Sequence, residues 1–150
     1  MYYLERGNGP TVVFLHGIGS DSKSFEFQLE AFATAGYHAV SWDMPGYGRS
    51  APLVPMTFTG LARRLRQFLE ELNVPTVHVV GHSIGGMIVQ QLARTAQDKL
   101  LTMVLAQTSQ RLGVRMENFK ESLSPNGWSH CNKVSLWLIS LLRSYPAWLV

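Results

Sequence analysis

The sequence predicts an α/β fold, a three-layer sandwich in which helices cover both faces of a mostly parallel sheet. Short apolar runs alternate with segments of helical periodicity, and turn-forming residues separate them. Strands joined by crossover helices are parallel and buried on both faces, so they occur in sequences as nearly continuous apolar runs. A Gly-x-Ser-x-Gly pattern at residues 81–85 stands between one such run and a helical segment, which is a third indication of this fold class.

Each expected element has its own pattern. Apolar runs predict strands, and apolar residues at three- and four-residue spacing predict amphipathic helices. Gly36 predicts the end of the first helix, and Thr57 or Thr59 predicts the N-cap of the second. The expected elements are an antiparallel edge strand over residues 2–6, strands over 11–16, 38–42, 77–80 and 101–106, and helices over 24–35, from 57 or 59 to 72, and 84–96.

The composition is that of one folded domain with a real core. The 150 residues are 46% hydrophobic and 15% charged, with a net charge of +3. No basic stripe occurs and no apolar segment is long enough for a bilayer, so we expect neither a nucleic-acid partner nor a membrane. No motif for a metal or a cofactor occurs, so neither is expected. The single Cys131 excludes an internal disulfide, and no secretory signal precedes the first strand, which predicts a cytoplasmic protein.

Ser83 lies in the pattern that carries the chemistry. Where a strand turns sharply into a helix, the backbone approaches its neighbours, so Cβ atoms at Gly81 and Gly85 would clash. The turn lifts the Ser83 side chain clear of the sheet and leaves the Ile84 N–H unpaired at a helix N-terminus, where the helix dipole favours an anion. A nucleophile beside an oxyanion donor is half of an acyl-transfer site. The alternative is a glycine-rich turn with a purely structural role. A Rossmann dinucleotide site is not favoured, because no Gly-x-Gly-x-x-Gly pattern follows the first strand.

Three sequence blocks carry a family resemblance. They are FLHGIGS at residues 14–20, WDMPGYGRS at 42–50 and GHSIGG at 81–86. In this order and spacing they resemble the oxyanion loop, the D-x-P-G-x-G-x-S turn and the nucleophile elbow of the α/β-hydrolase fold superfamily. The resemblance covers roughly residues 2–112 and implies the N-terminal half of that core, a truncated α/β-hydrolase core. It is closest to serine esterases and enol-lactone hydrolases that act on small molecules.

The resemblance implies roles for individual residues. Ser83 matches the nucleophile, Ile84 matches one backbone N–H donor of the oxyanion hole, and Ile18 matches the other, with Gly19 as the next candidate. His16 and His82 match structural or loop-shaping positions. Apart from the resemblance, His38 and His78 lie in predicted strands and are expected to pack there, and Asp43 is expected to organise its turn.

The acid and the histidine of a serine triad are missing from the expected places. In this family the chain order is serine, then acid, then histidine. After Ser83 the candidates are Asp98, Glu117, Glu121 and His130. Asp98 precedes a strand and so lies on the opposite rim of the sheet. The end of that strand, where some relatives carry an acid, has Ala-Gln-Thr-Ser at residues 106–109 and no carboxylate.

The C-terminal segment differs in composition from the rest of the chain. We expect residues 1–112 to form the N-terminal part of the core, and residues 113–150 to be the start of a cap region with an aberrant tail. Codons for LSPNGWSHCNKV at residues 123–134 permit, after one added base, the translation FVAQRLVPLQQG, which resembles the segment leading into the cap of many α/β-hydrolases. The loss of one base near codon 123 would explain why the cap-like sequence appears only in the shifted reading frame. A genuinely encoded cap helix is the alternative.

Two functions from different classes follow. The first is a hydrolase by descent, in which Ser83 attacks the carbonyl of a small ester or lactone, strongly impaired because the triad acid and histidine are absent. The second is a non-catalytic fragment, a pseudoenzyme or a binding remnant. Carbon–carbon bond hydrolases share the serine elbow and stay open, whereas dehalogenases would need an aspartate at position 83. The sequence does not predict an oligomeric state.

Overall fold

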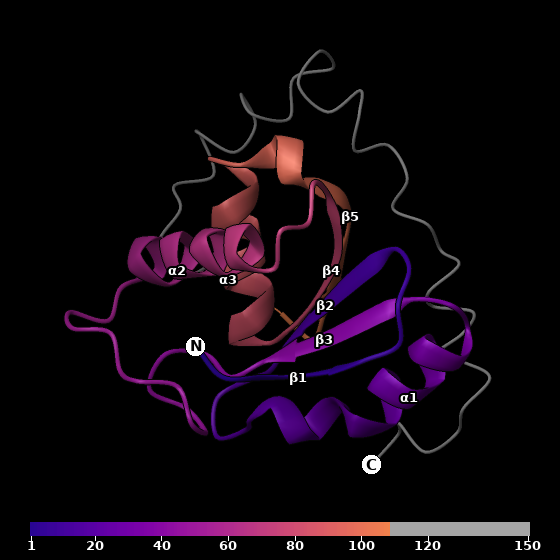
Figure 1. Ribbon diagram of the computed structural model, residues 1–150. Coiled ribbons are helices and arrows are strands. Elements are labelled where there is room, and N and C mark those ends of the chain that lie inside the picture. The colour runs from indigo at the N-terminus through magenta and orange to yellow at the C-terminus, as the bar shows by residue number, and fades with distance from the viewer. Residues whose placement is uncertain (109–150) are drawn as a thin grey trace.

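In the computed structural model, residues 1–108 are described. They form a five-stranded sheet with helices on both faces, as Figure 1 shows. This confirms the predicted α/β class with a mostly parallel sheet. The predictions for residues 113–150, which include the domain boundary, the reading frame and the candidates Glu117, Glu121 and His130, lie outside the described residues.

The elements alternate as the sequence predicts. The strands are β1 (Tyr3–Arg6), β2 (Thr11–Leu15), β3 (His38–Trp42), β4 (Val77–His82) and β5 (Leu100–Ala106). The α-helices are α1 (Glu26–Thr34), α2 (Phe58–Glu71) and α3 (Ile84–Ala93), and two short 3₁₀ turns are η1 (Ser22–Phe25) and η2 (Gln97–Lys99).

Most boundaries lie within one residue of the predictions, and the larger differences are at the first helix, β4 and α3. The first helix begins with η1, because the Asp21 side chain accepts the Lys23 N–H at 2.9 Å and closes a tight turn first. Strand β4 runs to His82, since its partner β5 continues opposite it to Ala106. Helix α3 ends at Ala93, three residues before its predicted end. Of the two candidate caps for α2, Thr57 accepts the Gly60 N–H at 3.0 Å.

The sheet order is β1-β3-β2-β4-β5. Strands β2, β3, β4 and β5 are mutually parallel, and β1 pairs antiparallel with β3 at one edge. The parallel register aligns Leu15 with both Trp42 and Gly81, so the chain leaves β2, β3 and β4 at the same rim. We call this end the carboxyl rim and the opposite end of the parallel strands the amino rim.

The helices divide between the two faces of the sheet. In Figure 1, α1 lies below the sheet, and α2 and α3 lie together on the other side. The larger core packs between the sheet and the α2–α3 pair, where Trp42 stacks on Phe68 with 5.7 Å between ring centroids. The smaller core packs against α1 and includes Phe14 and Leu29. Burial of each such side chain stabilises the fold by roughly 1.5–3 kcal/mol. This packing holds in place the strand ends that carry the site.

Candidate active site

Four segments meet at the carboxyl rim around Ser83. They are the β4–α3 junction itself, residues 17–20 after β2, residues 43–50 after β3 and residues 106–108 after β5. The loop after β2 lies directly beside the serine, because a Cβ built on Gly17 would stand 3.3 Å from the Ser83 Cβ and 2.9 Å from His82 Nδ1. The structure therefore brings the first and third motif blocks into contact.

Ser83 has a backbone conformation that side-chain-bearing residues rarely adopt. Its φ is 52° and its ψ is −119°. Such a conformation costs on the order of 1–3 kcal/mol and persists only where the surroundings impose it. The surroundings here are tight: a Cβ on Gly81 would stand 2.6 Å from the Gly86 Cα, and one on Gly85 would stand 2.5 Å from the Leu15 carbonyl oxygen. The clash predicted at both glycines is confirmed.

The two candidate oxyanion donors differ in their settings. Ile84 is the first residue of α3, and within residues 1–108 its N–H has no acceptor. Ile18 follows Gly17 in the loop beside Ser83, and the residue is 72% exposed. Gly19, the next candidate, has a φ of +76°. The roles of Ile84, Ile18 and Ser83 in catalysis stay predictions.

His16 is a buried link between two loops. The Met44 N–H donates to His16 Nε2 at 3.1 Å, so this nitrogen is the acceptor and the proton lies on Nδ1. His16 Nδ1 then donates to the Gly17 carbonyl at 2.8 Å. Burial lowers the pKa of His16 below its ordinary value, against the smaller raising effects of the Gly17 carbonyl and Asp43. His16 is a neutral loop-shaping residue, as expected, and both its nitrogens are occupied.

Asp43 holds the turn of the second motif block. One carboxylate oxygen accepts the Ser22 N–H at 2.7 Å and the other accepts the Arg49 N–H at 2.8 Å. Burial alone would raise the pKa of Asp43, but these N–H groups outweigh it and lower the pKa below its ordinary value. Gly48 has a φ of +51°, and a Cβ there would collide with the Asp43 carboxylate. This geometry fits the turn-organising role that the sequence predicts.

Residues 106–108 join the site, and the sequence did not assign them a role in it. Ser83 N–H donates to the Ala106 carbonyl at 3.0 Å, Thr108 Oγ1 donates to the Ser83 carbonyl at 2.7 Å, and His82 Nε2 lies 3.0 Å from Gln107 Oε1. In the sequence, this segment is distinguished only by its lack of a carboxylate. No recurring pattern would have found it, because two of its partners are backbone groups of Ser83.

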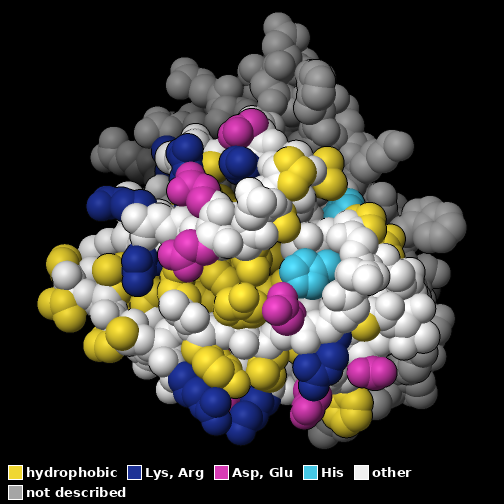
Figure 2. All heavy atoms as spheres, in the orientation of Figure 1, with side chains coloured by type: hydrophobic (Ala, Val, Ile, Leu, Met, Phe, Trp, Pro, Cys, Tyr) yellow, Lys and Arg dark blue, Asp and Glu magenta, His cyan; other side chains and the backbone are white. Residues whose placement is uncertain are grey.

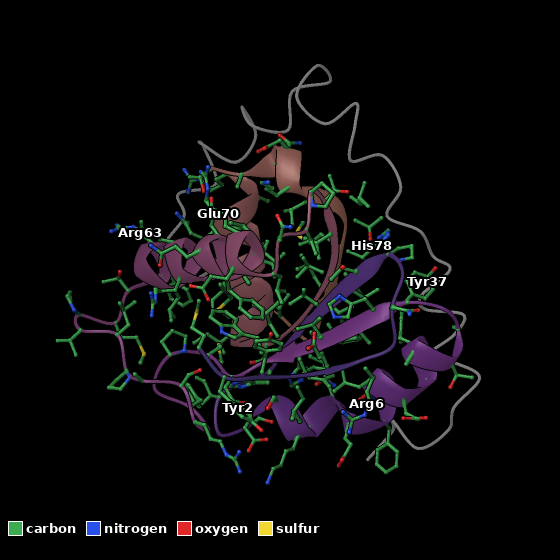
Figure 3. All side chains as sticks on the ribbon, viewed as in Figure 1. Tyr2, Arg6, Tyr37, Arg63, Glu70 and His78 are labelled. Atoms are coloured by element: carbon green, nitrogen blue, oxygen red, sulfur yellow. The ribbon has the colours of Figure 1, made fainter. Side chains whose placement is uncertain are left out.

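His38, His78 and Asp98 lie away from Ser83, towards the amino rim. The His78 ring lies 6.3 Å from the Tyr37 ring between centroids (Figure 3). His78 Nδ1 lies 2.8 Å from Thr102 Oγ1. Burial lowers its pKa below the ordinary value. At ~3.3 Å per residue along β4, His78 stands about 16 Å from Ser83. Asp98 lies in η2 before β5, which confirms its place on the amino rim.

Within residues 1–108, no carboxylate and no imidazole is hydrogen-bonded to the Ser83 hydroxyl. The same residues contain no group of three or more His, Cys, Asp or Glu side chains suited to a metal ion. No helix in this part of the chain has the length and apolarity that a bilayer crossing needs. Figure 2 shows acidic and basic side chains interspersed over the visible face.

Comparison with known proteins agrees with this geometry. The model of the alpha/beta hydrolase fold family matches residues 10–144. The chain is 39% identical over 105 residues to the dihydrolipoyllysine-residue acetyltransferase component of the acetoin cleaving system of Cupriavidus necator, covering 69% of this chain and 28% of that protein. It is 39% identical over 88 residues to an epoxide hydrolase of Caballeronia sordidicola, covering 57% of this chain and 27% of that protein.

A solved structure extends the likeness to three dimensions. The structure of Est816, described as an N-acyl homoserine lactone degrading enzyme, superposes with a TM-score of 0.69 at 27% identity. The match covers 83% of this chain and 49% of that one. The chain thus spans under half the length of each of these three relatives.

Proposed function

The chain belongs to the α/β-hydrolase fold family, and from that premise we propose that Ser83 is an acyl-transfer nucleophile by descent, directed at the carbonyl of a small ester or lactone. Ser83 Oγ would attack the carbonyl carbon, and the Ile84 and Ile18 N–H groups would stabilise the oxyanion of the tetrahedral intermediate. The alcohol would then leave, and water would release the acid from the acyl-serine.

The backbone of Ser83 is the observation that carries this proposal. A serine with φ 52° and ψ −119° stands between a strand and a helix, next to an N–H without an acceptor in residues 1–108. A structural turn alone would be cheaper with glycine at this position, because glycine adopts positive φ without the cost of a Cβ. The side chain at position 83 therefore has a use that outweighs its strain.

The chemistry of serine favours acyl transfer over epoxide opening, although one relative is an epoxide hydrolase. Attack of a hydroxyl on an epoxide carbon would leave an ether on the enzyme, which water does not cleave under mild conditions. Attack on an ester or lactone carbonyl leaves an ester, which water does cleave. The lactone-degrading relative fits the same preference. Ser83 thus supports carbonyl substrates.

We expect turnover by this chain to be strongly impaired. The His82 ring lies against Gln107, His16 has both nitrogens engaged and Asp43 has both carboxylate oxygens engaged, so none of them is placed to activate Ser83. Without a triad base and acid, catalysis by an oxyanion hole and binding alone reaches roughly 10³–10⁴-fold over water. The same observation favours the second candidate, a non-catalytic fragment or binding remnant.

Covalent labelling of Ser83 separates these two candidates. A fluorophosphonate that adds to a reactive serine is expected to give one adduct by intact mass, localised to Ser83 by peptide mapping. Ser83→Ala should abolish the adduct, whereas Ser24→Ala, at an exposed serine of η1, should retain it. If the wild-type chain forms no adduct at Ser83, or if Ser83→Ala still labels, the non-catalytic candidate is supported instead.

The proposed cause of the expected impairment has its own test, in the gene. We propose that one base was lost near codon 123. Sequencing both strands from codon 115 to well past codon 150 is expected to show that one inserted base restores FVAQRLVPL and opens a frame that encodes a later acid and histidine. A frame that stays closed after every single-base insertion near codon 123 would support an encoded cap helix.

A further inference from the structure

We propose that Thr108 is a positioning residue for the oxyanion hole: its hydroxyl fixes and polarises the peptide group that carries the Ile84 N–H. This inference rests on the proposed role of Ser83 as the nucleophile. It starts from the hydrogen bond of 2.7 Å that Thr108 Oγ1 donates to the Ser83 carbonyl oxygen.

The Ser83 carbonyl and the Ile84 N–H belong to one peptide group. That group is planar and trans, so its C=O and N–H point in opposite directions and turn together. A donor that holds the carbonyl oxygen therefore also sets the direction in which the Ile84 N–H points. A hydrogen bond accepted by the carbonyl further polarises the group, which makes its N–H a stronger donor. Thr108 thus acts on the N–H from the far side of the peptide group.

The Thr108 hydroxyl is not needed to satisfy the Ser83 carbonyl. The same oxygen already accepts the Gly86 N–H at 3.0 Å and the Met87 N–H at 3.4 Å from the first turn of α3. Thr108 adds a third and shorter bond. The Ser83 carbonyl oxygen is thus already hydrogen-bonded without Thr108. The main contribution of the extra bond is therefore to orient the peptide group.

The packing around Thr108 is built to keep it there. A Cβ on Gly86 would stand 2.8 Å from Cβ, Cγ2 and Oγ1 of Thr108, so only glycine at position 86 admits this side chain. Gln107 adopts a φ of 46°, at which the chain turns after β5. The Gln107 side chain meets His82, and the Ala106 carbonyl receives the Ser83 N–H. Residues 106–108 therefore bind the Ser83 N–H, the Ser83 carbonyl and the side chain of the neighbouring His82.

The test uses variants that separate the hydroxyl from the shape of the side chain. Thr108→Val removes the hydroxyl and keeps the volume, and Thr108→Ser keeps the hydroxyl. Thr95→Val is the matched control, because Thr95 Oγ1 donates to the Leu92 carbonyl at 3.3 Å near the other end of α3. Thermal unfolding of all three identifies any loss that comes from folding alone.

The first readout is the second-order rate of fluorophosphonate labelling at Ser83. Phosphonylation develops negative charge on the phosphoryl oxygen, so the rate reports the oxyanion donors. We expect Thr108→Val to slow labelling about tenfold, less than the roughly 10²–10³-fold cost of removing an oxyanion donor itself. Thr108→Ser should recover the rate to within about threefold of wild type, and Thr95→Val should match wild type.

The second readout is the amide resonance of Ile84 in a ¹⁵N-correlated NMR spectrum, which needs no reactivity. Loss of the bond to the Ser83 carbonyl in Thr108→Val should shift the Ile84 ¹⁵N resonance upfield, and Thr108→Ser should return it towards wild type. If Ser83 does not label but this shift pattern is seen, the proposed function fails and the positioning role stands. If the Ile84 resonance of Thr108→Val stays at its wild-type position, the positioning role is overturned, whatever Ser83 does.

Discussion

The two rims of the sheet use left-handed backbone differently. At the amino rim the chain turns through Gly36, with φ +84°, and Asn73, with φ 53°. These are residue types that adopt such angles at little cost. The carboxyl rim also has left-handed glycines, such as Gly19 and Gly48, but there Ser83 and Gln107 take φ values of 52° and 46° as well. Neither residue type does so readily, so the strain of the described fold is concentrated where the candidate site lies.

The polar groups of the two rims also differ, in burial and in the groups that bind them. At the carboxyl rim, His16 and Asp43 are each 1% exposed and are held largely by backbone groups, whose positions the fold fixes. At the amino rim, Glu5 and His38 form a 2.7 Å pair between side chains that are 49% and 20% exposed. The polar groups of the carboxyl rim are therefore buried and bonded to the backbone, whereas the amino rim has a more exposed contact between two side chains. Four substitutions test this contrast.

Gly85→Ala is expected to have the largest effect. The new Cβ would stand 2.5 Å from the Leu15 carbonyl, a backbone atom that cannot move aside without shifting β2. We expect the free energy of unfolding to fall by about 3 kcal/mol or more. Gly36→Ala, which meets nothing within 4 Å, should cost only the left-handed conformation, about 1–2 kcal/mol. Urea unfolding measures both, and equal losses would contradict the contrast.

Asp43→Asn should lower the free energy of unfolding by about 2–3 kcal/mol. An amide offers one acceptor oxygen where the carboxylate accepts two N–H groups, from Ser22 and Arg49, so one buried or partly buried N–H loses its partner. Asp21→Asn is the control, since asparagine caps a turn as well as aspartate does, and its expected change is close to zero. A similar loss in both variants would mean that the turn does not depend on the paired acceptance.

Buried His16 predicts a pH dependence of stability. Its pKa is lowered by burial, so the unfolded chain binds more protons than the folded chain below about pH 6.5, and stability falls as pH falls from there. The slope reaches at most about 1.4 kcal/mol per pH unit for one group. His16→Gln should flatten this part of the curve more than His78→Gln, because His78 is less buried. The free energy of unfolding at pH 5, 6 and 7 gives this slope for each variant. Equal slopes for His16→Gln and wild type would show that His16 is not its source.

Glu5→Gln is expected to have the smallest effect. Its pair with His38 is exposed, and such pairs contribute about 0–1 kcal/mol. We expect a loss below about 1 kcal/mol, and any part of it that comes from a charged His38 shrinks in high salt, because ions screen exposed charges. A loss as large as that of Asp43→Asn would show that the exposed pair stabilises the fold as much as the buried hydrogen bonds of the carboxyl rim do.

The strands and helices could be predicted because their patterns are local. The apolar run of β2 and the helical spacing of α2 each identify an element without reference to the rest of the chain. The start of α1 could not be placed, because its first turn depends on whether Asp21 accepts a nearby N–H. The end of β4 could not be placed either, because it depends on the length of β5 opposite it.

The candidate site could be predicted only where glycine and serine mark it. Gly81, Ser83 and Gly85 form a pattern because their conformations exclude other residue types. Thr108 forms no pattern, since its partner is a backbone carbonyl and any residue could supply one. Likewise, the proton position on His16 follows from the Met44 N–H, a group that every residue except proline carries.

The close contacts at Gly81 and Gly85 have a consequence for how such sequences evolve. Both glycines are required for the strand, the helix and the neighbouring strand to fit together, whether or not Ser83 ever reacts. A lineage that lost turnover would therefore keep both glycines under selection for folding alone. The motif would outlive the activity, and its persistence in a gene would record ancestry and a working fold, leaving catalysis to be established one protein at a time.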